Sequence, residues 1–130
     1  MDRIFSPYII VFIGAGLGGV LRHALNNAIP RVLGLSFPWA TPVINVTGSV
    51  VMGLLVGWLA FKAGAGWSQH VRLFVATGIL GGYTTFSTFS LETVLLFERQ
   101  AYAAAAAYVL GSVICGVLGL YVALMFTRSF

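Results

Sequence analysis

Residues 78–90 read Gly-Ile-Leu-Gly-Gly-Tyr-Thr-Thr-Phe-Ser-Thr-Phe-Ser, a glycine-rich half followed by a cluster of hydroxyl and aromatic side chains. The glycines permit a helix to break and expose backbone carbonyls, which membrane proteins tolerate only inside protein or beside an aqueous cavity. Thr-Phe-Ser occurs twice at a period of three, so Phe86 and Phe89 lie near one another on a helix. Because hydroxyl groups are costly in hydrocarbon unless they find partners or line a polar path, this stretch predicts a broken helix that carries the functional site.

The rest of the chain has the composition of a membrane protein. Of its 130 residues, 59% are hydrophobic and 8% are charged, which is outside the range of soluble domains. Four apolar segments, at about residues 8–29, 39–61, 71–97 and 102–126, are each long enough to cross a bilayer as a helix. We therefore expect an all-α membrane protein, a single four-helix transmembrane domain over residues 1–130, with the third helix broken near Gly78–Thr85.

Polar connections separate these segments, the second of them running from Lys62 to His70. The first segment follows Asp2 and Arg3 like the start of a signal peptide, but its length favours a retained span. The formal charge of +4 comes from scattered basic residues, so no nucleic-acid footprint is expected. The single cysteine, Cys115, excludes a disulfide within the chain and a cysteine metal site.

The basic residues give almost no orientation in the membrane. With four spans, one side would hold four of them and the other side three (Arg3, Lys62, Arg72 and Arg128 against Arg22, Arg31 and Arg99). A chain without a preferred orientation inserts both ways, and two opposite copies can pair as an inverted repeat. We expect an antiparallel, dual-topology homodimer, the alternative being a weak bias that still gives one orientation.

Two familiar motifs have structural readings here. The run Gly14–Gly19 fits the dinucleotide pattern G-x-G-x-x-G but lies in a membrane helix with no strand before it. The spacing of Gly14 with Gly18, like that of Gly53 with Gly57, predicts close helix packing instead. His23 and His70 have no third ligand nearby and are interpreted as interfacial histidines.

The polar groups within the spans are mostly neutral donors, which suit a small anion better than a cation. Phenylalanine fits the same interpretation, because the positive edge of its ring can face an anion that has shed water. The alternative is that Phe86 and Phe89 only fill the bundle. The polar set comprises Arg22, Thr41, Asn45, Thr47, Ser49, Thr84, Thr85, Ser87, Thr88, Ser90, Glu92, Tyr108 and Ser112.

Several of these motifs together resemble the Fluc/CrcB family of fluoride channels. The run at 78–90 resembles the signature of that family, and its other marks are matched by Gly18-Gly-Val-Leu-Arg22, Asn45-Val-Thr-Gly48 and Tyr108-Val-Leu-Gly-Ser112. The resemblance covers all four spans in order. It implies a passive fluoride-selective channel that exports cytoplasmic fluoride and protects the cell, built as an antiparallel homodimer with two pores in the bacterial inner membrane.

When the functional residues of the family are matched to this sequence position by position, the resemblance implies a fluoride path and a cation site. The rings of Phe86 and Phe89 and the amide of Asn45 would face the ion, while Arg22 would attract anions to the vestibule, with snorkelling to the interface as the alternative. The backbone carbonyls of Gly81 and Thr84 would hold a structural sodium ion at the dimer interface. The remaining path residues would be Thr41, Thr88, Glu92, Tyr108 and Ser112, and Gly116 replaces a serine that the family can carry beyond Ser112.

A passive pore requires no energy-coupling module, and no sequence motif here predicts one or an enzyme active site. The competing interpretation is a small multidrug transporter, which is also a four-helix dual-topology dimer. That class needs a titratable carboxylate in its first span, and residues 8–29 contain none. A purely structural membrane protein would leave the polar cluster at 84–90 without a role.

Overall fold

The computed structural model describes residues 2–61 and 69–129, and within them every regular element is a helix. Most of the expected connection from Lys62 to His70 lies outside the described residues. The elements are α1 (Asp2–Leu33), α2 (Ala40–Phe61), the π-helix η1 (Arg72–Leu80), α4 (Gly81–Tyr83), α5 (Phe86–Glu98) and α6 (Tyr102–Arg128).

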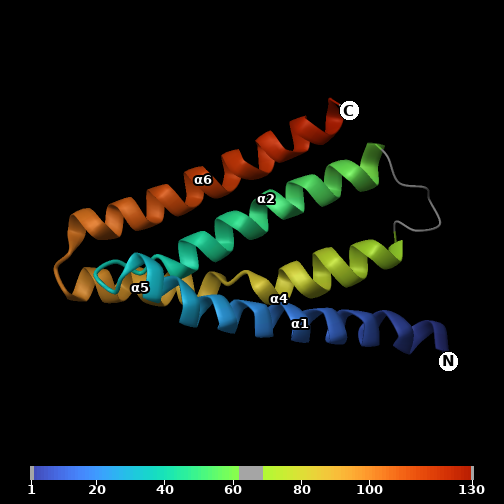
Figure 1. Ribbon diagram of the computed structural model, residues 1–130. Helices are drawn as coiled ribbons and strands as arrows, with labels where there is room; N and C mark the ends of the chain where they lie inside the picture. The colour runs from blue at the N-terminus through green and yellow to red at the C-terminus, as the bar shows by residue number, and fades with distance from the viewer. Residues whose placement is uncertain (1, 62–68, 130) are drawn as a thin grey trace.

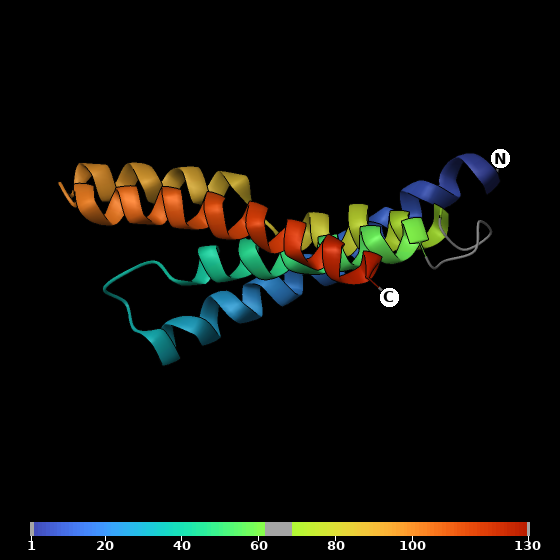
Figure 2. The same cartoon turned by 90° about the horizontal axis from the view of Figure 1, so that it is seen from above.

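The helices lie lengthwise in an elongated bundle, with both chain termini at the same end (Figure 1). α2 packs mainly on α6, and α1 packs mainly on η1 and α4. Seen from above, α5 continues the direction of η1 and α4 and runs beside the first half of α6 (Figure 2). The chain therefore turns back on itself between α5 and α6, through the short connection at residues 99–101.

Among the residues that the structure describes, three helices are long and apolar enough to cross a membrane, namely Ser6–Leu33, Ala40–Phe61 and Tyr102–Arg128. The segment expected at 71–97 is interrupted, because Thr84 and Thr85 are extended between α4 and α5. The prediction of a broken third helix is therefore confirmed. The break does not lie at the glycines, however, since Gly81 itself has helical dihedral angles and the helix continues through Tyr83.

Two of the three glycines before the break, Gly78 and Gly82, serve helix packing. A Cβ added to Gly78 would lie 2.9 Å from the Cα of Gly14 on α1, and one added to Gly82 would lie 2.9 Å from the Cα of Ala15. On the other side of the bundle, Gly53 faces α6, where an added Cβ would lie 2.9 Å from Ala123. The interpretation of the glycine motifs as close helix contacts is confirmed, because these backbones approach too closely for a side chain.

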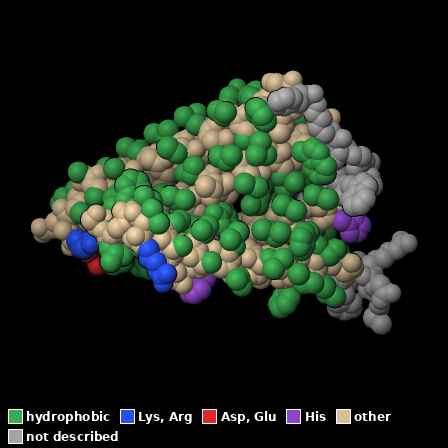
Figure 3. Space-filling model, viewed as in Figure 1, with side chains coloured by type: hydrophobic (Ala, Val, Ile, Leu, Met, Phe, Trp, Pro, Cys, Tyr) green, Lys and Arg blue, Asp and Glu red, His purple; other side chains and the backbone are tan. Residues whose placement is uncertain are grey.

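The outer surface is apolar over most of its length. Hydrophobic side chains cover the face shown in Figure 3, and the Lys and Arg side chains visible there gather toward the end away from the termini. Large hydrophobic side chains such as those of Phe12, Val20 and Val117 are more than half exposed. A surface of this kind faces lipid or another protein, since soluble proteins rarely expose continuous apolar area on this scale.

Candidate functional site

The break in the third helix is held by one side chain of α2. The amide of Asn45 donates from Nδ2 to the carbonyl oxygen of Thr85 at 3.0 Å, and its Oδ1 accepts from the backbone N–H of Thr85 at 2.8 Å. Both polar groups of the Thr85 backbone are thus satisfied by a residue 40 positions earlier in the chain. This pairing replaces the hydrogen bonds that an unbroken helix would supply, which is required at membrane depth.

Thr85 also begins α5 as its N-cap residue. Its Oγ1 accepts from the backbone N–H of Thr88 at 3.2 Å and donates to Thr88 Oγ1 at 3.1 Å, and it lies 3.4 Å from Ser87 Oγ. A threonine at this position satisfies one of the N–H groups that the first turn of a helix leaves unpaired. The first turn of α5 therefore carries a connected set of hydroxyl groups beside the break.

A carboxyl group lies further along α5, where it joins three helices. Glu92 accepts from Thr41 Oγ1 of α2 at 3.1 Å through Oε1, and from the hydroxyl of Tyr108 of α6 at 2.5 Å through Oε2. Thr41 and Tyr108 are both 1% exposed, whereas Glu92 is half-buried. Each such bond contributes about 1 kcal/mol net, and removal of one partner costs more because the other group stays buried.

Aromatic rings connect the break to this carboxyl group. The ring centroids of Phe86 and Phe89 are 5.8 Å apart, and Phe89 stacks on Tyr108 at 5.4 Å with an interplanar angle of 17°. Phe89 belongs to the side chains packed around the buried cluster of Leu96, Ala105 and Tyr108. Phe86 is 79% exposed, so packing within the chain does not account for its position.

Three cavities adjoin these groups. A cavity of about 600 Å³ at the end of the bundle is lined by Thr88 and Glu92 together with the α1–α2 connection. A second, of about 390 Å³, lies at the break and is lined by Asn45, Thr85 and Phe86 among others. A third, of about 450 Å³, lies between α2 and α6 and is lined by Tyr108 and Ser112 among others. The break and the carboxyl group therefore each open onto space outside the packed core.

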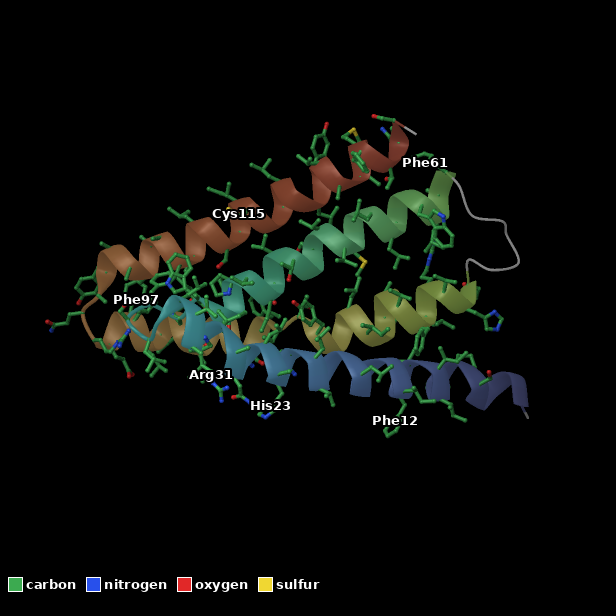
Figure 4. All side chains as sticks on the ribbon, viewed as in Figure 1. Phe12, His23, Arg31, Phe61, Phe97 and Cys115 are labelled. Carbon is green, nitrogen blue, oxygen red and sulfur yellow. The ribbon has the colours of Figure 1, made fainter. Side chains whose placement is uncertain are left out.

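The structure brings most of the predicted path residues into contact, but Ser112 and Arg22 lie apart from the others. Ser112 lies along α6 beyond Tyr108, and its buried Oγ has no hydrogen-bond partner among the described residues. Arg22 is partly exposed on α1 and lines none of the three cavities. Arg31 and His23 on the same helix point away from the bundle (Figure 4), and His23 is bonded to Asn27. The residues joined by hydrogen bonds or ring contacts are Thr41, Asn45, Thr85, Phe86, Thr88, Phe89, Glu92 and Tyr108.

Thr85 belongs to the polar set predicted from the sequence, but not to the residues predicted to line the fluoride path or to bind sodium. The signal that could have identified it is local, since a threonine that directly precedes a helix is a preferred N-cap residue. Its pairing with Asn45 had no such signal, because the two residues belong to different helices.

The described residues contain no group of three His, Cys, Asp or Glu side chains that could hold a metal ion. Backbone carbonyls at the break are a different kind of ligand. In an unbroken helix the carbonyl of Gly81 would accept from the N–H of Thr85 and that of Thr84 from the N–H of Thr88. Both N–H groups are instead bonded to side-chain oxygens, those of Asn45 and Thr85. Carbonyl oxygens without these donors fit a hard cation such as sodium.

Comparison with known proteins places this arrangement in a family. Residues 9–124 match the family described as "CrcB-like protein, Camphor Resistance (CrcB)". A protein of Rhodopseudomonas palustris (strain BisB5) named "Fluoride-specific ion channel FluC" is 56% identical over 122 residues, covering 94% of this chain and 97% of that protein. One of the same name from Methylobacterium nodulans is 58% identical over 122 residues, covering 94% and 96%. The chain belongs to the CrcB-like family.

Proposed function

We infer that this protein is a fluoride-specific ion channel, a multi-pass membrane protein rather than an enzyme. The observation that carries the inference is the similarity to channels of that name over 94% of the chain, which includes every residue of the candidate site. The chemistry of the site agrees, because hydroxyl groups, an amide and ring edges can each offer a partial positive charge to a small anion.

The proposed fluoride path follows the third helix from the break toward the carboxyl group. Asn45 and Phe86 adjoin the cavity at the break, Phe89 and Thr88 continue the path, and Tyr108 reaches the opposite end. A dehydrated anion needs many weak donors, which this sequence of side chains supplies. Arg22 at the vestibule and Thr41, Glu92 and Ser112 along the walls complete the proposed set.

The proposed assembly is an antiparallel homodimer of four-helix subunits. η1, α4 and α5 together would form the fourth crossing beside α1, α2 and α6, so that residues 1–130 make one domain. An even number of crossings agrees with the position of both termini at one end of the bundle (Figure 1). Two copies inserted in opposite directions would bring their breaks together and give two pores.

In this proposal a structural sodium ion lies between the two subunits. The carbonyls of Gly81 and Thr84 from each copy would bind it, and both residues line the cavity at the break. The ion would supply positive charge that stabilises the facing carbonyls, while the side-chain oxygens of Asn45 and Thr85 accept hydrogen bonds from the backbone and hold it open.

Export of fluoride through such a pore would require no energy-coupling step. Hydrogen fluoride is a neutral weak acid that crosses lipid and dissociates in a less acidic cytoplasm, where the anion is trapped. The membrane potential drives an anion outward with about 2.3 kcal/mol for each 100 mV, so a selective passive path lowers the internal concentration.

The direct test is fluoride efflux from proteoliposomes containing the purified protein. We expect rapid efflux of fluoride when a potassium ionophore balances charge, and no comparable efflux from liposomes loaded with chloride. Protein-free liposomes serve as the control. Equal rates for the two anions would contradict a fluoride-specific channel, and absence of flux would favour a structural role.

Dual topology predicts that the C-terminus is found on both sides of the membrane. The basic residues are divided four against three, so insertion should be nearly balanced. Tagged C-termini can be mapped by protease or thiol-reagent access in intact cells. Two or three lysines added to one set of loops should bias insertion and lower activity, and an oppositely biased copy should restore it. A single location for all wild-type C-termini would refute the antiparallel model.

Gly81→Val tests the proposed cation site against packing within the chain. A Cβ at Gly81 has only the carbonyl oxygen of Ala76 nearby, at 3.7 Å, so the subunit has room for a side chain there. We therefore expect Gly81→Val to suppress transport by weakening association of two subunits, by about 1 kcal/mol or more, as overpacking does. Gly82→Val is the comparison. A Cβ at Gly82 would lie too close to the backbone of Ala15, so this substitution should destabilise the subunit itself. Normal transport and sodium binding by Gly81→Val would show that the cation site is elsewhere.

A further inference from the structure

Two side chains control which backbone groups are available at the break. The N–H of Thr85 is bonded to Asn45 Oδ1 at 2.8 Å, and the N–H of Thr88 is bonded to Thr85 Oγ1 at 3.2 Å. These are the two N–H groups that would otherwise donate to the carbonyls of Gly81 and Thr84 in a continuous helix. For both carbonyls proposed as sodium ligands, the N–H group that would donate in a continuous helix is thus bonded to a side-chain oxygen instead.

We propose that Asn45 and Thr85 are positioning residues for the cation site, which act by withholding hydrogen-bond donors from the carbonyls of Gly81 and Thr84. Neither side chain would touch the ion. This inference rests on the proposed sodium site and adds the residues that keep its ligands available. It also gives Asn45 a role in addition to contact with fluoride, because both polar atoms of its amide are already bonded to the Thr85 backbone.

The physical argument is that buried backbone groups must be satisfied. Thr85 is 8% exposed, so its N–H cannot rely on bulk water if the acceptor on Asn45 is removed, and Thr88 is half-buried, which limits the access of water to its N–H. The acceptors that remain within reach along the chain are the carbonyls four residues earlier. Without the side-chain bonds, a more continuous third helix would be the favoured arrangement, and its hydrogen bonds would occupy the sodium ligands.

The neighbouring threonine gives an internal contrast. Thr84 Oγ1 and the N–H of Thr84 both donate to the carbonyl of Leu80, at 2.9 and 3.0 Å, so this last carbonyl before the glycine pair is doubly satisfied. The pattern changes at the next carbonyl, that of Gly81, whose helical donor is bonded to Asn45. The carbonyl of Leu80 therefore keeps its helical donor, whereas the carbonyl of Gly81 loses its helical donor to the amide of Asn45.

The test measures sodium binding through thermal stability of the full-length detergent-solubilised protein, as the shift in unfolding midpoint between sodium chloride and N-methylglucamine chloride. We expect a sodium-dependent increase for the wild type. For Thr85→Val, the sodium concentration that gives half of this increase should rise by about 10- to 100-fold, as when a group that orients metal ligands is lost. Thr85→Ser keeps the hydroxyl acceptor and should restore the wild-type response.

The matched control is Thr93→Val. Thr93 lies on α5 like Thr88, but its Oγ1 donates to the carbonyl of Phe89 within the helix and does not divert a donor. Its replacement should leave the sodium response unchanged. If Thr85→Val does not yield folded protein, Thr85→Ala removes the same acceptor without added branching and carries the same expectation.

Two results would overturn the inference. One is a wild-type sodium response in Thr85→Val or Thr85→Ala, and the other is an equal loss in Thr93→Val, which would show a general effect of hydroxyl removal. A wild-type protein with fluoride efflux but no sodium response would overturn this inference together with the sodium site and leave the fluoride channel intact. Fluoride efflux measured on the same preparations separates these cases.

Discussion

Replacement of Asn45 by Asp is expected to lower fluoride efflux from proteoliposomes by about 100-fold, which corresponds to about 2.7 kcal/mol in the transport barrier. The substitution changes two things at once. It replaces the Nδ2 donor, 3.0 Å from the carbonyl oxygen of Thr85, with a second oxygen that cannot donate. It also places a negative charge beside the cavity at the break, where it repels an approaching anion.

Asn27→Asp is the matched control for the added charge. Asn27 is exposed on α1, is bonded to His23 and lines none of the three cavities. The same chemical change there should leave efflux within about twofold of the wild type, because the added charge would not lie at any of the three cavities. Size-exclusion chromatography checks that both variants keep the oligomeric state of the wild type. Wild-type efflux from an intact Asn45→Asp channel would remove Asn45 from the path.

Replacement of Phe86 or Phe89 by Ile is expected to slow fluoride efflux by about fivefold for each C–H contact that is lost, since each such contact with the ion is worth about 1 kcal/mol. Isoleucine keeps an apolar side chain of similar size but lacks the positive ring edge. The effect should therefore be on the rate of transport, with the oligomeric state of the wild type unchanged in size-exclusion chromatography. The exposure of Phe86 makes it the more informative site, because an exposed ring contributes little to the folding of its own subunit.

Phe12→Ile is the control for loss of an exposed ring. Phe12 is 79% exposed, the same fraction as Phe86, but it points away from the bundle on α1 (Figure 4). Its replacement should leave efflux unchanged. If the two rings only fill space, Phe86→Ile and Phe89→Ile should conduct at wild-type rates. That outcome would reject the proposed role of both phenylalanines.

The glycine pattern predicted that the third helix is broken, but it did not predict the exact position of the break. Glycines at 78, 81 and 82 predicted an interruption of the third helix, and the interruption exists. It lies after them, at Thr84 and Thr85, because the extended backbone there is stabilised by Asn45 and by the cap of α5. Two of the glycines, Gly78 and Gly82, are required instead by the close approach of α1.

The all-helical membrane architecture, the polar cluster at 84–90 and the presence of a break could be predicted from the sequence alone. These features depend on local properties, namely the length of apolar segments, their polar interruptions and the spacing of side chains along one helix. The tertiary structure alone decided that Asn45 pairs with Thr85 and that Thr41 and Tyr108 meet at Glu92, contacts that span 40, 51 and 16 positions of the chain. No local pattern specifies such contacts, because they arise when helices pack and buried polar groups must find partners on whichever helix lies opposite.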